Sequence, residues 1–190
     1  MTKKVFRIIL AVVAVIIIIC VAAVNFIPRS EQAGGYDIPR LSHKNIVDAI
    51  GLFTGRLGLA SQPAGSMEDT IQVGDSFGYD KKAYAKKLPE RFDVIMFKSP
   101  DDESVYFAKR IIGLPGETIE IIDGQVYINN EPLEEDFIKG EWEENFEAYE
   151  IGENSYFTMG DNRNVSGDSR IWINKTVPFE NIKGKVILLY

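Results

Sequence analysis

The sequence predicts a mainly β domain that follows one N-terminal membrane-spanning helix. Two observations lead to this prediction. Residues 6–27 are almost entirely apolar, whereas from Ser61 onward short apolar runs alternate with Gly, Pro, Asn and Asp turn signals. Many short strands with frequent turns are typical of β-barrels and sandwiches. We therefore expect a cytoplasmic N-terminus and transmembrane anchor at 1–27, a linker and amphipathic helix at 28–60, and a β-rich domain at 61–190.

The first segment is long enough to cross a membrane as a helix. At 1.5 Å per residue, the apolar run 6–27 reaches about 33 Å, which matches the hydrocarbon core of a bilayer. A cleaved signal peptide is the alternative, but its apolar core is shorter, about 7–15 residues. Lys3, Lys4 and Arg7 lie on the short flank, so the positive-inside rule places the N-terminus in the cytoplasm and the rest of the chain outside. We expect a single-pass cell-membrane protein in contact with membrane lipid.

The part of the chain beyond this anchor is acidic and has no cysteine. It carries 18 Lys and Arg against 28 Asp and Glu, a net charge of −10, because the first 27 residues hold three basic residues and no acidic one. An acidic surface argues against nucleic acid as a partner. The one cysteine, Cys20, lies within the apolar run. Disulfides, thiolate chemistry and metal sites built from cysteine are therefore excluded beyond the anchor.

The individual elements follow from local patterns. Helical spacing of apolar residues predicts a packed surface helix over Lys44–Ala60, in preference to one lying in the membrane interface. Asp123-Gly124 is the strongest short-range hairpin signal, so the runs on either side of it should pair. Residues 131–150 are acidic and aromatic, and we expect a long surface excursion there. The expected strands cover Ile71–Val73, Asp93–Phe97, Val105–Ile112, Thr118–Ile122, Gln125–Ile128, Ile151–Met159 and Val186–Tyr190.

One lysine lies where strand alternation makes it costly. In the expected strand Val105–Ile112, Lys109 shares a face with Phe107 and Ile111. If this is the core face, burial disfavours the ammonium form and lowers the pKa of Lys109. A neutral amine can act as a general base, which requires a nucleophile, and Ser66 upstream is a candidate. The alternative is that Lys109 extends its amine to water.

Three segments carry a family resemblance. They read Gly-Ser-Met-Glu-Asp-Thr-Ile at 65–71, Phe-Ala-Lys-Arg-Ile-Ile-Gly-Leu-Pro-Gly at 107–116 and Met-Gly-Asp-Asn-Arg-Asn-Val-Ser-Gly-Asp-Ser-Arg at 159–170. Each is weak alone, but in this order and after one anchor they resemble the type I signal peptidases, membrane-anchored serine proteases with a Ser–Lys dyad. The resemblance covers about residues 61–190. It implies a β-rich, extracytoplasmic catalytic domain and a serine endopeptidase that removes signal peptides from exported preproteins.

The resemblance also implies roles for individual residues. Ser66 matches the nucleophile and Lys109 the general base. Ser166 matches the serine whose hydroxyl orients the lysine amine, and Asp168 and Arg170 match a pair that supports that corner of the site. The backbone N–H of Ser66 is the expected oxyanion donor, since backbone donors aimed at developing charge are the usual device. No metal ion and no other cofactor is implied.

Substrate preference follows by analogy with the same family. Its members cleave substrates that carry small residues at positions −1 and −3 before the cleaved bond. Because they flank the expected nucleophile and base, Met67, Ile71 and Ala108 are the expected walls of the small pockets that would receive these residues. The one histidine, His43, lies in the expected linker, so a Ser-His-Asp triad is excluded unless that residue folds back.

Two positions depart from the family pattern. Asp69 stands where the family usually has proline, and an acid there would hold Lys109 in its charged form. Ala64 occupies the position where some members place a serine hydroxyl as a second oxyanion donor. Two alternatives therefore stay open: a catalytically impaired or specialised membrane-tethered homologue acting on few substrates, and a self-cleaving Ser–Lys protein. The anchor and the lack of a DNA-binding domain argue against a self-cleaving repressor.

Overall fold

The structure, a computed structural model, describes residues 54–189. The expected anchor, the linker with His43 and most of the expected helix lie outside the described residues. Within the described part, no helix is long and apolar enough to cross a membrane. That part is mainly β, as expected.

Its elements are β1 (Leu57–Ser61), η1 (Gly65–Met67), β2 (Ser76–Asp80), β3 (Val94–Lys98), β4 (Tyr106–Gly113), β5 (Thr118–Ile122), β6 (Gln125–Ile128), β7 (Glu131–Pro132), β8 (Phe146–Glu150), β9 (Ser155–Met159), β10 (Val177–Pro178), η2 (Phe179–Asn181) and β11 (Ile182–Leu189).

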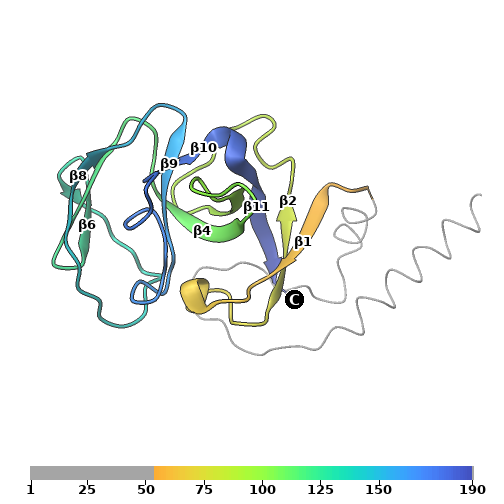
Figure 1. The fold of residues 1–190 in the computed structure, drawn as a ribbon, viewed down its shortest axis with the longest axis horizontal. Helices are drawn as coiled ribbons and strands as arrows, with labels where there is room; N and C mark the ends of the chain where they lie inside the picture. The colour runs from red at the N-terminus through yellow and green to blue at the C-terminus, as the bar shows by residue number, and fades with distance from the viewer. Residues whose placement is uncertain (1–53, 190) are drawn as a thin grey trace, which may run out of the picture.

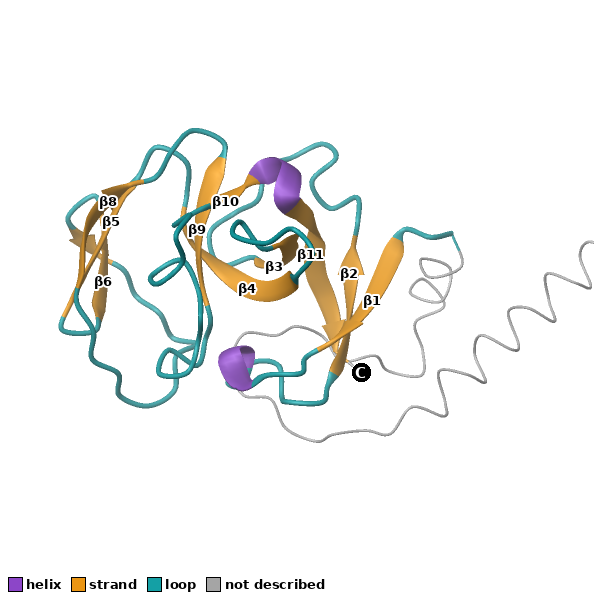
Figure 2. Cartoon of the chain, in the orientation of Figure 1, coloured by secondary structure: helices purple, strands orange, loops and turns teal. Residues whose placement is uncertain are grey.

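The strands form two antiparallel sheets. The larger has the order β1-β2-β11-β3-β4-β9-β10, and the smaller has the order β7-β6-β5-β8. The smaller sheet is inserted between β4 and β9 and lies on one side of the molecule (Figure 1). Short turns, several long loops and two 3₁₀ turns connect the strands (Figure 2). A buried cluster joins the sheets, with Ile112 and Phe157 from the larger one packed with Ile119 and Val126 from the smaller.

The hairpin between β5 and β6 confirms the most local of the sequence predictions. Both strands have the predicted bounds, and they pair from Ile119–Ile128 to Ile122–Gln125. The turn residues Asp123 and Gly124 both have positive φ, 48° and 81°. This is the backbone that a two-residue hairpin turn needs, and it explains why Asp-Gly is selected there.

The predicted helix over Lys44–Ala60 is wrong at its C-terminal end. The chain is already a strand from Leu57, so the β domain starts before the expected boundary at Ser61. Gly55 has a φ of 69°, a conformation that interrupts a helix. Gly58 packs under the ring of Tyr79 in β2, where a Cβ atom would meet the ring at 2.2 Å. Leu57 and Ala60 fit the helical spacing, but both lie in β1 and pair with β2.

Two further segments differ from expectation. Ile71–Val73 is not a strand; it follows η1 as a turn, and β2 begins only at Ser76. Residues 131–150 are not a simple surface excursion either. Their two ends are β7 and β8, which pair with β6 and β5 on the two sides of the smaller sheet. The stretch between β7 and β8, residues 133–145, is called the bridging segment below.

Candidate active site

Lys109 lies in the interior of the molecule. It is on β4 opposite Ile95 of β3, and only 2 % of it is exposed. Phe107 and Ile111 share its face, as predicted, and the amine lies 5.7 Å from the centre of the Phe107 ring. The alternative in which Lys109 extends to water is therefore wrong. Its burial follows from β4 being covered on both faces, because the neighbouring Arg110 is equally buried.

The amine of Lys109 has one hydrogen-bond partner among the described residues. Its Nζ atom lies 3.0 Å from the hydroxyl oxygen of Ser166, which is itself buried. Burial lowers the pKa of Lys109 to about 8; the negative charge of Asp168 opposes the shift, as does that of Asp161 more weakly, and Arg170 adds to it. At neutral pH, about a tenth of the molecules then carry a neutral amine at this position.

Asp168 and Arg170 form a buried ion pair beside Ser166. Nε of Arg170 lies 2.8 Å from Oδ1 of Asp168, and Nη2 donates to the other carboxylate oxygen at 2.9 Å. Burial favours the neutral acid, but the hydrogen bonds and charge of Arg170 outweigh it and hold the pKa of Asp168 below its ordinary value. Asp168 also accepts the Gly160 N–H at 2.9 Å. The pair thus fixes both ends of the loop that carries Ser166.

Ser66 lies on η1, next to the same loop. Its carbonyl oxygen accepts the Asn162 N–H at 3.2 Å. A Cβ atom on Gly160 would lie 2.3 Å from the Ser66 carbonyl oxygen and 2.3 Å from the Ser166 hydroxyl oxygen, so those two oxygens are at most twice that distance apart. The loop therefore brings the Ser66 backbone to the partner of Lys109. No hydrogen bond joins the Ser66 hydroxyl to the Lys109 amine in the described part of the chain; that hydroxyl lies 3.4 Å from the side-chain nitrogen of Gln62.

The three residues expected to form pocket walls lie together. Met67, Ile71 and Ala108 are buried in one cluster, with Phe77 and Val94 from β2 and β3. This cluster packs against the face of β4 that carries Ala108, whereas Lys109 points to the opposite face. The structure thus places these three residues in one cluster. Their contact with a substrate stays a prediction.

Asp69 does not face Lys109 in the way its sequence position suggested. Its carboxylate accepts the backbone N–H of Lys139 at 3.2 Å, and its carbonyl accepts the Lys139 amine at 3.1 Å. The charges that shift the pKa of Lys109 come from Asp168, Arg170 and Asp161. Asp69 instead ties the segment that carries Ser66 to the bridging segment.

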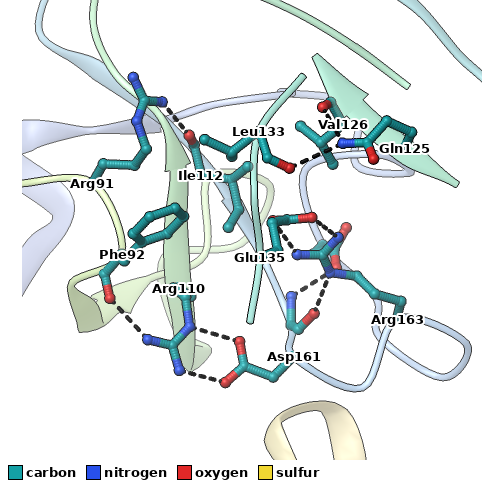
Figure 3. Close-up of polar contacts among 12 residues, drawn as sticks. Arg91, Phe92, Arg110, Ile112, Gln125, Val126, Leu133, Glu135, Asp161 and Arg163 are labelled. Atoms are coloured by element: carbon teal, nitrogen blue, oxygen red, sulfur yellow. Dashed lines mark hydrogen bonds and ion pairs between the residues drawn. The ribbon is translucent and has the colours of Figure 1, made fainter. Parts of the chain in front are cut away.

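A second buried ion pair, missed from sequence, links the three segments that carry the family resemblance. Arg110 lies beside Asp161 with two short contacts, 2.8 Å from Nε and 2.6 Å from Nη2 (Figure 3). The Thr70 hydroxyl donates to the same carboxylate and accepts from Arg110 at 3.2 Å. Arg110 also donates to the Phe92 carbonyl at 2.9 Å. The sequence gives little sign of this pair, because strand alternation alone does not show that the face of Arg110 is buried as well as that of Lys109.

The bridging segment contacts the loop that carries Ser166. Glu135 binds both terminal nitrogens of Arg163, at 2.9 and 2.6 Å (Figure 3). The guanidinium groups of Arg163 and Arg170 lie 4.8 and 5.5 Å from the Trp142 ring centre. Glu144 forms an ion pair with Arg170. This segment, whose role the sequence left open, therefore covers the loop with an aromatic ring and two carboxylates.

Comparison with known proteins identifies the family. The family model described as "Signal peptidase, peptidase S26" matches residues 46–190. The signal peptidase I of Leptolyngbya laminosa is 33 % identical over 153 residues, which cover 77 % of this chain and 74 % of the relative. A probable signal peptidase I-1 of Synechocystis sp. is 35 % identical over 135 residues, which cover 67 % and 68 %. This chain therefore belongs to the signal peptidase family, a family of membrane-associated serine peptidases.

A solved structure is also similar. The crystal structure of a signal peptidase I from Enterococcus faecalis V583 is 36 % identical, with a TM-score of 0.45, and the match covers 52 % of this chain and 97 % of that one.

Proposed function

We propose that this protein is a membrane-bound serine endopeptidase that removes signal peptides from exported preproteins, with Ser66 as nucleophile and Lys109 as general base. One observation carries the proposal: a lysine amine that is almost fully buried, hydrogen-bonded to Ser166 and titrating near pH 8. A general base works best with a pKa close to the operating pH, and an ordinary lysine is far from it.

In the proposed reaction, the neutral Lys109 amine takes the proton of the Ser66 hydroxyl as its oxygen attacks the scissile carbonyl carbon. The resulting ammonium gives a proton to the departing amine, which leaves an ester on Ser66, and water then hydrolyses this ester with Lys109 again as base. Ser166 supports this role because it accepts one N–H of the amine and so fixes its direction. Asp168 and Arg170 hold the loop that carries Ser166.

The oxyanion would bind at the start of η1. The Ser66 N–H has no acceptor within residues 54–189, as is normal for the first N–H groups of a helical turn. A backbone donor at the nucleophile itself is well placed for the charge that develops on the substrate carbonyl.

The edge of β4 supports an extended substrate. Pairing with β3 runs from Tyr106 to Arg110, whereas pairing with β9 starts only at Arg110. Along Tyr106–Lys109, the other edge of β4 thus has no strand partner in the described part of the chain. An extended peptide can pair with such an edge and present alternate side chains to the site. Met67, Ile71 and Ala108 are proposed as walls of the pockets for its small residues.

Asp69 was the reason to consider an impaired homologue. Because its carboxylate binds the Lys139 N–H and the charges acting on Lys109 come from elsewhere, its position favours an active enzyme.

The test uses the full chain in detergent and a preprotein with a small-x-small cleavage site. Ser66→Ala and Lys109→Ala should each abolish cleavage, while Ser61→Ala and Lys87→Ala, at exposed positions, should not. Equal cleavage by wild type and Ser66→Ala would refute the mechanism.

A further inference from the structure

Gln62 is a buried polar residue close to the proposed nucleophile. It directly follows β1, and 5 % of it is exposed. Its backbone is fixed on both sides, because its N–H donates to the Asp75 carbonyl at 2.9 Å and its carbonyl accepts the Gly74 N–H at 2.8 Å. The side chain therefore extends from a rigid point four residues before Ser66.

The orientation of the Gln62 carboxamide follows from its neighbours. Its nitrogen lies 2.6 Å from the Ala64 carbonyl oxygen, which can only accept a hydrogen bond. The nitrogen and not the oxygen must face this carbonyl, since the reverse arrangement would bring two acceptors together. One of the two amide hydrogens is thus used by Ala64. The other is available to the Ser66 hydroxyl oxygen, which lies 3.4 Å from the same nitrogen.

This contact has a chemical consequence. A hydroxyl oxygen that accepts from an amide nitrogen must direct its own hydrogen elsewhere, because that nitrogen cannot accept it. The hydrogen of Ser66 is then free for the base. As the proton leaves, negative charge develops on the Ser66 oxygen and next on the carbonyl oxygen joined to it through the attacked carbon. The second N–H of Gln62 lies beside the first of these positions, the Ser66 oxygen, and the methyl side chain of Ala64 has no hydrogen to donate there.

We propose that the Gln62 side chain is a catalytic residue: its amide N–H donates to the negative charge that develops at Ser66, alongside the Ser66 backbone N–H. This inference rests on the proposed peptidase function. A fixed donor of this kind acts mainly in the transition state, because it makes only a long contact in the resting enzyme and shortens as charge appears. It should therefore affect kcat and leave KM unchanged.

The test compares two identical chemical changes. Gln62→Met keeps the side-chain length but removes the N–H, and Gln125→Met makes the same change in β6, away from the site. With the full chain in detergent and a peptide substrate, Gln62→Met should lower kcat by about tenfold to a hundredfold with KM unchanged. Gln125→Met should match wild type. An unchanged kcat in Gln62→Met overturns the inference.

A second measurement separates catalysis from packing. A peptide boronate forms a tetrahedral adduct with the Ser66 oxygen, whereas the cleaved peptide product binds without a covalent bond. Gln62→Met should weaken boronate binding by the same factor as kcat/KM and leave product binding unchanged. Equal weakening of both ligands would mean a packing role and would overturn the inference. A wild-type chain that neither cleaves the substrate nor binds the boronate would refute the proposed function itself.

Discussion

The lowered pKa of Lys109 predicts that this residue makes folding less favourable at neutral pH. The pKa falls from an ordinary 10.5 to about 8 on burial. A shift of this size corresponds to about 3 kcal/mol, since each pKa unit is about 1.4 kcal/mol. Between the two pKa values the unfolded chain binds more protons than the folded chain. The penalty is therefore fully present below pH 8 and is relieved as the pH rises towards 10.5.

The measurement is the free energy of unfolding by urea, for the full chain in detergent, at several pH values from 7 to 10. Lys109→Met removes the titrating group. Relative to this variant, wild type should gain about 2–3 kcal/mol between pH 7 and pH 10. Lys87→Met changes an exposed lysine paired with Glu90, and its unfolding free energy should change with pH as that of wild type does. If the unfolding free energies of wild type and Lys109→Met also change with pH in the same way, burial does not destabilise the ammonium form of Lys109 and the reasoning fails.

Three further predictions concern the groups around the site. Gly160→Ala places a Cβ atom 2.3 Å from the Ser66 carbonyl oxygen and the Ser166 hydroxyl oxygen; displacement of either should lower kcat by about a hundredfold, and a wild-type rate in a folded variant would contradict this geometry. Asp161→Asn removes the carboxylate that forms a buried ion pair with Arg110, so urea unfolding should show a loss of about 3–5 kcal/mol. Glu103→Gln, which breaks an exposed pair with Lys98, should cost less than about 1 kcal/mol. Asp69→Asn should change kcat by less than about twofold, because its carboxylate binds the Lys139 N–H; a large gain in rate at neutral pH would show that Asp69 holds Lys109 charged.

The sequence predicted those features that depend on local pattern. The β5–β6 hairpin is fixed by Asp123-Gly124 and was predicted with its bounds. Strand alternation placed Lys109 on the face of Phe107 and Ile111 but left its burial open, and the structure shows that both faces of β4 are covered there. The prediction of a helix over Lys44–Ala60 is wrong at its C-terminal end, because a few apolar residues at helical spacing also fit a strand. Only the pairing with β2 decides between helix and strand there.

The parts of the site that the sequence did not predict depend on contacts between distant segments. The Arg110–Asp161 pair joins residues 51 positions apart, and the Arg163–Glu135 pair joins residues 28 apart. Gln62 is a different case, since it lies only four residues from Ser66. Its amide points at that hydroxyl because the chain turns at η1, and nothing in its residue type indicates that turn.

The most direct test of the proposed mechanism is the pH dependence of Ser66 acylation. The rate at which an acylating peptide probe labels the full chain should rise with pH to a plateau and be half-maximal near pH 8, the value at which the Lys109 amine loses its proton. Ser66→Ala should not be labelled, and Lys109→Met should lose the rate and the pH dependence together. A labelling rate that is independent of pH between 6 and 10, or one that survives in Lys109→Met, would contradict the account.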